Sequence, residues 1–434
     1  MQVSVEKTSE LSRKMTITVP EDVVQEKVDK RLKSVAREVK IDGFRPGKVP
    51  QKVVKKMYGA RVREEITSDL IQEHYFLALQ ENDMRPAGMP QIEPVKTDEG
   101  FCFTAVFEEY PELTLDGVDN IAINKSVSSV AASDVDTMIE KLIEQRKTWQ
   151  ATEQEAEEGN RLTIKLSGVS EGENFTDGTI ENFEVEIGAQ RMIPGFEDEL
   201  KGLVVGGVKK FEVTFPDDYT NKDLAGKLAE FDIEVLQVEA SVLPEVDVEF
   251  IQAYGIESGE VDEFRADVES NMQRELAQGL KANLKNKVME ALIENVSVTL
   301  PAAMIEQEIE SLMKPYYENA KKQNMDVNEL KLPKENFEEQ AQKRVALGLI
   351  LAEIIQKNEI KAEADKVRAV IDGMAQSYEQ PEDVVKWYYD DEKQLAEVKQ
   401  MVLEDAAVDW VLAKASVTDE AVSFGDVMEP ETQQ

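Results

Sequence analysis

The side chains that most enzymes use for acid–base, nucleophilic or metal chemistry are scarce in this sequence. Its 434 residues include one histidine, His74, and one cysteine, Cys102. One imidazole and one thiol are too few for a Cys/His metal cluster, and they give no credible Ser-His-Asp set. His74 lies within a helical pattern, so we interpret it as a surface or packing residue, and Cys102 lies in the alternating run FCFTAVF, so we interpret it as a small strand residue. We therefore expect no metal and no cofactor.

The stretch GFRPGKVP, residues 43–50, is the first place where residue types and spacing suggest a function. Gly and Pro are excluded from helix interiors, so their number here predicts a loop or hairpin tip. A phosphate-binding loop requires G-x-x-x-x-G-K-[ST]. Gly43 and Gly47 are too close for that motif, and Val49 stands where it requires a hydroxyl. The candidate binding residues of this loop are Gly43, Phe44, Arg45, Pro46, Gly47, Lys48 and Pro50.

Positive charge is concentrated around this loop. Residues 27–63 hold 13 basic and 3 acidic residues, although the whole chain has a formal net charge of -38. A basic patch on an acidic chain is typical of docking on a polyanion, because the acidic remainder limits non-specific adhesion. A solvated helix face is the alternative interpretation.

The elements around the loop predict that it is presented at a tip. Residues 1–112 read as an α+β domain, with strand alternation in MQVSVEKT and KMTITV and a helix in EDVVQEKVDKRLKSVAREV. A second helix is predicted from about Gln51 to Gln80, and two strands near QIEPVK and FCFTAVFEEY close the domain. The loop falls where the two helices meet, which is a position suited to contact with a partner.

The rest of the chain divides into three predicted parts. Residues 113–160 read as a bridging helix and linker, and residues 161–244 alternate with period two, as in a small sheet domain with a short helix at IPGFEDELKG. Residues 245–434 are predicted to be mostly helical, ending in a loose tail, VSFGDVMEPETQQ. The predicted helices of this last part lie near 261–295, 301–323, 335–358, 361–377, 381–388 and 391–414.

The small sheet domain resembles the FKBP-type peptidyl-prolyl isomerases. The resemblance is carried by LSGVSEGENFTDG, NFEVEIGAQRMIPGFEDELKGLVVGG, VTFPDDY and AEFDIEVLQVE. In that family an apolar, aromatic-lined pocket holds the proline ring. Two positions differ from the usual family pattern, with Leu166 in place of Tyr and Thr176 in place of Asp. The pocket residues that the resemblance implies are Leu166, Phe175, Phe183, Met192, Ile193, Phe196, Tyr219 and Phe231.

Such a pocket needs no titratable group. An X-Pro bond isomerises slowly because amide resonance sets a barrier of about 18–20 kcal/mol. An apolar pocket disfavours the polar, planar amide relative to the twisted transition state, which is catalysis by differential binding.

Over its full length the chain resembles the bacterial trigger factor family of ribosome-associated chaperones. In that family a G-F-R-x-G-x-x-P loop docks on ribosomal protein and RNA beside the exit tunnel, and Gly43, Phe44, Arg45, Gly47 and Pro50 match that loop. The implied fold class is multidomain α+β, with an N-terminal ribosome-binding domain, an FKBP-like domain and a helical, substrate-binding C-terminal domain. The implied partners are the ribosome and unfolded nascent polypeptides, with no membrane, and the implied location is the cytoplasm. A homodimer of the free protein is left open.

The helical region offers candidate contacts for nascent chains, because helices with Met and aromatic residues on one face bind adaptable apolar segments. Ordinary helix–helix packing is the competing interpretation, and the sequence does not separate the two. A free cytosolic FKBP-type isomerase with substrate-recruiting flanking domains is the alternative function, although it would have no need of the basic loop. A nucleic-acid-binding protein is disfavoured by the net charge. The client-binding candidates are Met304, Ile305, Leu312, Met313, Tyr316 and Tyr317.

Overall fold

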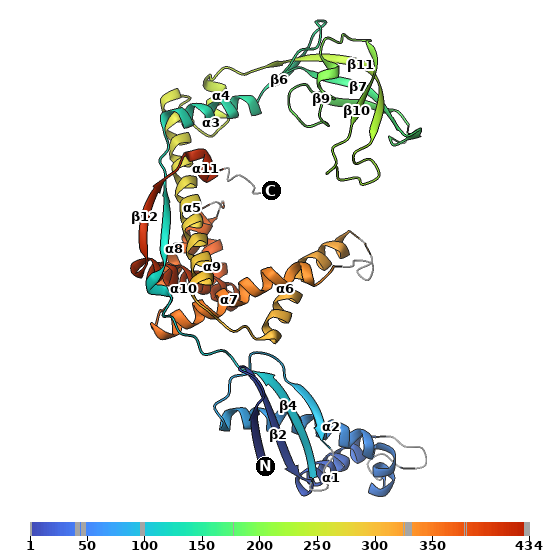
Figure 1. Cartoon of the computed structure of the whole chain (residues 1–434), viewed down its shortest axis with the longest axis vertical. Helices are drawn as coiled ribbons and strands as arrows, with labels where there is room; N and C mark the ends of the chain where they lie inside the picture. Colours follow the sequence, from blue (N-terminus) through green and yellow to red (C-terminus); the bar gives the residue numbers. More distant parts are fainter. Residues whose placement is uncertain are drawn as a thin grey trace. The chain divides into compact units, whose positions relative to one another are not determined.

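The computed structural model describes residues 2–39, 44, 49–95, 100–176, 178–323, 325, 332–376, 378 and 380–428. The chain forms two compact units. One comprises Met1–Ser126 with Ala282–Glu420, and the other comprises Val127–Lys281 with Ala421–Gln434. Each is described below by itself, with the elements labelled as in Figure 1.

The N-terminal part of the first unit is a four-stranded antiparallel sheet with two helices packed against it (Figure 1). The strand order is β1-β2-β4-β3. Met15 and Ile17 of β2 face Ala105 and Phe103 of β4, and all four are buried. The elements are β1 (Gln2–Lys7), β2 (Ser12–Pro20), α1 (Glu21–Glu38), α2 (Gln51–Glu81), β3 (Gln91–Val95) and β4 (Gly100–Glu108).

The two helices form where the sequence predicts them. Val24, Val28 and Leu32 of α1 repeat every four residues and are buried against the sheet and α2. Glu21 and Asp22 occupy the first turn of α1, where negative charge complements the helix dipole.

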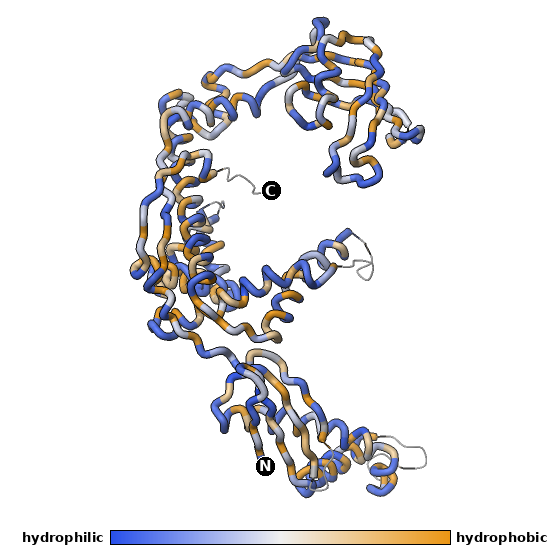
Figure 2. Tube along the Cα trace, in the orientation of Figure 1, coloured by the Kyte–Doolittle hydropathy of each residue, from blue (hydrophilic) through white to orange (hydrophobic). Residues whose placement is uncertain are grey.

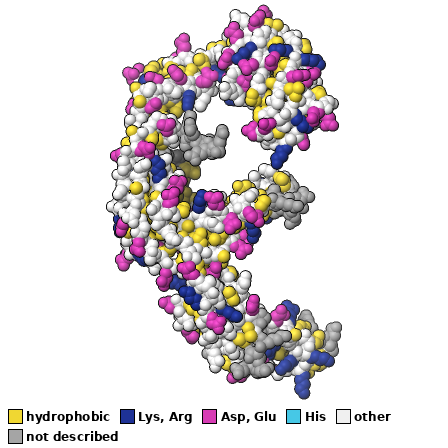
Figure 3. Space-filling view, viewed as in Figure 1, with side chains coloured by type: hydrophobic (Ala, Val, Ile, Leu, Met, Phe, Trp, Pro, Cys, Tyr) yellow, Lys and Arg dark blue, Asp and Glu magenta, His cyan; other side chains and the backbone are white. Residues whose placement is uncertain are grey.

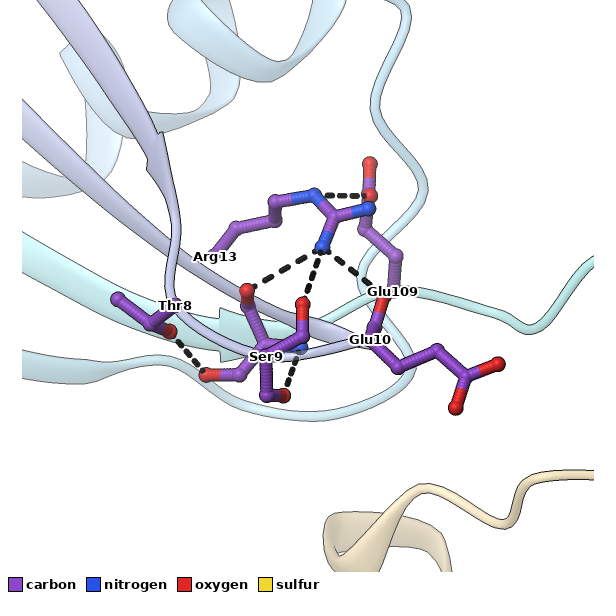
Figure 4. Close-up of polar contacts among 6 residues, drawn as sticks. Thr8, Ser9, Glu10, Arg13 and Glu109 are labelled. Atoms are coloured by element: carbon purple, nitrogen blue, oxygen red, sulfur yellow. Dashed lines mark hydrogen bonds and ion pairs between the residues drawn. The ribbon is translucent and has the colours of Figure 1, made fainter.

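One arginine closes the hairpin between β1 and β2 (Figure 4). The Nη1 of Arg13 donates to the carbonyl oxygens of Ser9, Glu10 and Ser12 at 3.1–3.4 Å. Its Nε forms an ion pair of 2.7 Å with Glu109, just after β4. The turn and the end of the central strand are thereby tied to the same side chain.

The second unit contains a six-stranded antiparallel sheet. Strands β10, β11, β7 and β8 follow in that order, β9 also pairs with β7, and β6 also pairs with β11. Phe231 of β11 faces Gly168 of β7, and Ile233 faces Leu166. Alternate residues of β7 and β11 are buried. Figure 2 shows hydrophobic and hydrophilic positions interspersed in this sheet domain. The elements are β6 (Thr148–Ala151), β7 (Arg161–Ser170), β8 (Glu173–Asn174), β9 (Ile180–Glu186), η2 (Asp198–Leu200), β10 (Val208–Thr214) and β11 (Leu228–Val242). The short helix predicted at IPGFEDELKG is thus a turn followed by the 3-10 turn η2.

A second core of this unit joins three helices. Val135 and Ile139 of α3 (Ala132–Gln145) pack with Phe250 of α4 (Val248–Gln252) and Phe264 of α5 (Val261–Asn295). The apolar spacing of these residues explains why the bridging segment is helical here.

The helical region agrees closely with the predicted helices, and the predicted multidomain α+β class is confirmed. Val288 and Leu292 of α5, Ile350 of α7 and Val411 of α10 belong to one buried core. None of the helices in the described ranges is long and apolar enough to cross a bilayer. The remaining helices are α6 (Ala302–Lys322), α7 (Glu335–Lys357), α8 (Ala364–Ala375), α9 (Pro381–Asp390) and α10 (Glu392–Lys414).

Two further features of the chain differ from the prediction. The bridging segment also contains the 3-10 turn η1 (Val118–Asn120) and the strand β5 (Ala122–Val127), and β5 pairs with β12 (Ser416–Ala421). The predicted loose tail is wrong for its first part, because Phe424–Met428 forms the helix α11.

A capping interaction and one packed side chain explain why Phe424–Met428 is helical. Ser423 and Asp426 exchange reciprocal hydrogen bonds of 3.1 Å, as in a capping box, and Phe424 packs on the core formed by α3, α4 and α5. Residues 429–434, the rest of the predicted tail, lie outside the described residues.

Candidate functional site

Aromatic rings converge on Phe231 in the second unit. Its ring centroid lies 5.1 Å from that of Phe196, 5.6 Å from Phe175 and 5.8 Å from Phe211. The Phe196 and Phe175 rings meet it edge to face, at 86° and 83°. Phe215 completes the group at 6.4 Å. We call this group the ring cluster.

Three of the predicted pocket residues, Phe175, Phe196 and Phe231, belong to the ring cluster, and the others lie in the surrounding domain core or, for Tyr219, beside Phe215. Leu166, Phe196 and Phe231 are buried in the domain core, while Phe175, Phe183, Met192 and Ile193 are partly buried against it. Tyr219 is 37% exposed, and its ring lies 4.7 Å from that of Phe215. The structure therefore brings together eight residues that span 66 positions of the sequence, from Leu166 to Phe231.

Sequence reasoning did not include two members of the ring cluster. Phe211 lies on β10 and Phe215 just beyond its end, and both are buried on the same face as Val213. The period-two spacing in FEVTF carries this signal, because alternate residues of a strand point to one face.

A glycine makes room for one of the rings. A Cβ added at Gly168 would lie 2.3 Å from Cζ of Phe175, so the ring rests directly on the backbone of β7. The Oγ1 of Thr176 accepts the N–H of Gly168 at 3.1 Å and lies 2.9 Å from Oδ1 of Asn174. The hydroxyl at the position where the FKBP family often has a carboxylate thus fastens the Phe175 loop to the sheet.

The polypeptide turns sharply just before Phe196. Gly195 has φ of +88°, a conformation that favours glycine, and lets the N–H of Phe196 bond the carbonyl of Ile193 at 3.0 Å. Phe196 is fully buried as a result.

The ring cluster is formed by apolar groups. Ion pairs lie on neighbouring strand positions that face away from it, such as Lys210 with Asp232 at 2.9 Å and Lys165 with Glu234 at 3.4 Å. Within the described ranges, no group of His, Cys, Asp and Glu side chains is arranged to hold a metal ion. The arrangement can bind an apolar ring in a desolvated surface, and it presents no buried acid or base to a substrate.

The loop at residues 43–50 is described in part. Phe44 is 40% exposed, whereas Val49 is buried in the core and Pro50 is the N-cap residue of α2. Gly43, Arg45, Pro46, Gly47 and Lys48 lie outside the described residues. Figure 3 shows Lys and Arg side chains gathered over the α1–α2 end of this part.

Some of the basic residues between 27 and 63 form ion pairs within the domain. Arg63 forms a two-pronged ion pair with Glu21, at 2.7 and 3.0 Å. Arg31 bonds Glu65, and Lys27 bonds Glu73. These pairs link α1 to α2, and they are exposed, so each contributes little to stability.

The client-binding candidates on α6 are mostly packing residues. Met313 is buried between α6 and α7, and Ile305, Leu312 and Tyr317 are partly buried in the same cluster. Met304 packs on a neighbouring cluster. Tyr316 is the exception, because it is 53% exposed while its ring edge contacts Phe337 at 5.5 Å between centroids. In the described part of the helical region, exposed aromatic residues that sequence reasoning did not include are Tyr378, Trp387 and Tyr389.

The fold and the ring cluster define an FKBP-type isomerase domain within a longer chain. The family model for FKBP-type peptidyl-prolyl cis-trans isomerases matches residues 152–236. The model for the bacterial trigger factor protein matches residues 1–142, and the model for its C-terminus matches residues 260–413.

The chain belongs to the bacterial trigger factor family of chaperones. It is 41% identical to the trigger factor of Hahella chejuensis (strain KCTC 2396), covering 100% of this chain and 97% of that protein. It is 43% identical to the trigger factor of Pseudomonas putida (strain GB-1), covering 99% and 98%. A solved structure of a trigger factor chaperone, reported for promiscuous substrate recognition in folding and assembly, has the same fold, with a TM-score of 0.50, 18% identity and coverage of 95% and 99%.

Proposed function

We propose that the ring cluster catalyses cis/trans isomerisation of X-Pro bonds. The observation that carries this proposal is the convergence of Phe175, Phe196 and Phe231 beside the half-exposed Tyr219. A proline ring bound on this apolar surface leaves its amide in a weakly polar environment, where the twisted transition state loses less solvation than the planar ground state. Leu166, Phe183, Met192 and Ile193 would complete the surface.

Peptide isomerisation tests this proposal. The full chain should accelerate isomerisation in a tetrapeptide with a single Ala-Pro bond, and Tyr219→Ala should reduce kcat/KM without the core damage expected from Phe196→Ala. Val208→Ala is the matched control, because Val208 is exposed on β10 of the same sheet. A rate equal to the uncatalysed rate would refute the proposal.

We further propose that the chain docks on the ribosome through the loop at residues 43–50. The match of this loop to the family motif, the exposure of Phe44 and the anchoring of Val49 in the core support this proposal. Anchoring at Val49 reduces the entropy that this end of the segment loses on docking. Arg45 and Lys48 would contact phosphates or acidic side chains near the exit tunnel, with Phe44 as the apolar anchor.

The division of labour that we propose follows the chain. Residues 1–112 bind the ribosome, 113–160 bridge, 161–244 isomerise X-Pro bonds, and 245–434 hold unfolded nascent polypeptides. The protein would act in the cytoplasm, where ribosomes meet new chains. Should ribosome binding fail while isomerisation succeeds, a free prolyl isomerase with substrate-recruiting flanking domains would take its place.

A further inference from the structure

One carboxylate in the isomerase-type domain accepts four backbone hydrogen bonds. The Oε2 of Glu197 accepts the N–H groups of Gly188 at 2.8 Å and Gln190 at 3.1 Å. Its Oε1 accepts those of Arg191 at 2.9 Å and Met192 at 3.1 Å. Both oxygens of this side chain are therefore committed to one loop, residues 188–192.

This loop leads into the hydrophobic core that contains the ring cluster. Met192 and the next residue, Ile193, pack partly buried against that core. The loop reaches them through Gln190, whose φ of +54° is sparsely populated by residues that carry a side chain. A backbone in this conformation persists only where its surroundings enforce it, and the four bonds to Glu197 are such a restraint.

Glu197 also links loop 188–192 to Phe196. Its chain neighbour Phe196 is a fully buried member of the ring cluster, and the N–H of Phe196 donates to the carbonyl oxygen of Ile193. A shift of the Glu197 carboxylate would therefore move the loop relative to Phe196.

The charge of Glu197 suits this task. Burial alone would raise the pKa of its carboxyl group, but the four N–H donors outweigh burial and lower the pKa below the ordinary value. Charged neighbours on adjoining segments are Glu158, which lies against Gly188, and the Asp198–Lys201 pair at 2.9 Å. The carboxylate is thus ionised at neutral pH, and an ionised carboxylate accepts N–H bonds more strongly than a neutral amide does.

We propose that Glu197 is a positioning residue of the isomerase pocket, holding loop 188–192 so that Met192 and Ile193 form the wall for the substrate's proline ring. This inference rests on the isomerase function proposed above. Glu197 acts through the loop and does not touch the substrate. If the loop is released, only a fraction of molecules presents the wall, and the apparent affinity falls by that fraction. We therefore expect loss of the Glu197 restraint to raise KM and to change kcat little.

The test uses the full chain with Glu197→Gln, since the amide retains one acceptor oxygen and turns an NH₂ group toward the loop. Glu199→Gln is the matched control, because Glu199 lies two residues further on and its carboxylate pairs with Lys209 at 2.8 Å instead. With the Ala-Pro tetrapeptide, Glu197→Gln should raise KM about tenfold or more, since small misplacements of binding groups are costly. Glu199→Gln should leave KM unchanged.

Hydrogen–deuterium exchange supplies a readout that general destabilisation would not give. In Glu197→Gln, the peptide covering residues 188–192 should exchange faster, while the peptide covering β11 keeps its wild-type rate. If the Gln variant unfolds the domain, Glu197→Asp keeps the charge but withdraws it by one methylene, and it should show the same rise in KM.

The outcomes separate the two proposals. An inactive wild-type chain would overturn the isomerase function and this inference with it. An active wild-type chain whose KM is the same in the Glu197 and Glu199 variants would overturn the inference alone.

Discussion

Phe196 and Phe231 meet edge to face, with ring centroids 5.1 Å apart, at the centre of the ring cluster. Phe196 follows a glycine turn and Phe231 lies on a long strand, so the contact joins a loop to the sheet. Edge-to-face pairs stabilise a core beyond their buried area. The same contact gives the proposed proline site a rigid base.

The absence of a side chain at Gly168 is expected to determine the position of the Phe175 ring. Gly168→Ala places a methyl group where the Phe175 ring now lies, so the ring must move and the pocket loses one side. We expect kcat/KM for the Ala-Pro tetrapeptide to fall about tenfold or more. Val169→Ala, one residue further on and exposed, is the control. Equal rates in the two variants would show that Phe175 does not contribute to the site.

The buried hydroxyl of Tyr75 is expected to lower the free energy of unfolding. It is buried beside Phe107 and has no hydrogen-bond partner among the described residues. Burial also raises the pKa of Tyr75 to about 12. An unsatisfied buried polar group costs about 1–3 kcal/mol, so Tyr75→Phe should raise the urea midpoint of unfolding. Tyr110→Phe, at an exposed ring, should not change it. A lower midpoint for Tyr75→Phe would reveal a partner for this hydroxyl.

The single histidine is expected to link stability to pH. Burial lowers the pKa of His74 from its ordinary value of 6.5, although Glu73 beside it favours the charged form. The unfolded chain therefore binds the proton more readily than the folded chain. The stability contribution is complete above pH 6.5 and is lost as the pH falls from there toward the folded pKa.

Two measurements check this pH dependence. As the only histidine, His74 gives a single imidazole Cε1–H signal by NMR, and the titration midpoint of that signal should lie below 6.5. The loss of unfolding free energy between about pH 7.5 and pH 5.5 should be smaller in His74→Gln than in the wild type. A midpoint at or above 6.5 would contradict the burial argument.

Two neighbouring residues of α6 are expected to behave differently. Met313→Ala removes a buried side chain between α6 and α7, and should cost about 2–5 kcal/mol of stability. Tyr316→Ala removes an exposed ring and should leave stability nearly unchanged while weakening the suppression of client aggregation. Light scattering of a denatured client during dilution measures this activity. Full activity in Tyr316→Ala would place the client surface elsewhere.

The sequence predicted the elements well because their patterns are local. The spacing of Val24, Val28 and Leu32 defines the buried face of α1 without reference to any other segment. The strands of the isomerase-type domain follow from alternation in the same way. In contrast, Met313 and Tyr316 lie three residues apart on one helix, and only the position of α7 decides which of them is buried.

The site residues that could be predicted are mainly those that match the FKBP sequence motif. Phe196 and Phe231 follow from the FKBP resemblance, and Phe211 and Phe215 lie in an alternating run that could have been used. The four bonds of Glu197 could not be predicted, because they require the left-handed conformation of Gln190, which no sequence pattern specifies.

Ribosome binding at two salt concentrations tests the account most directly. The full chain and the triple variant Phe44→Ala, Arg45→Ala, Lys48→Ala would be sedimented with purified bacterial ribosomes, with Met89→Ala, an exposed apolar residue of the same unit, as the control. We predict that the wild type and Met89→Ala bind, that binding weakens at higher salt because phosphate contacts release counterions, and that the triple variant stays in the supernatant. Sedimentation of the triple variant equal to that of the wild type, or no binding by any of the three proteins, would contradict a ribosome-docking role for the loop.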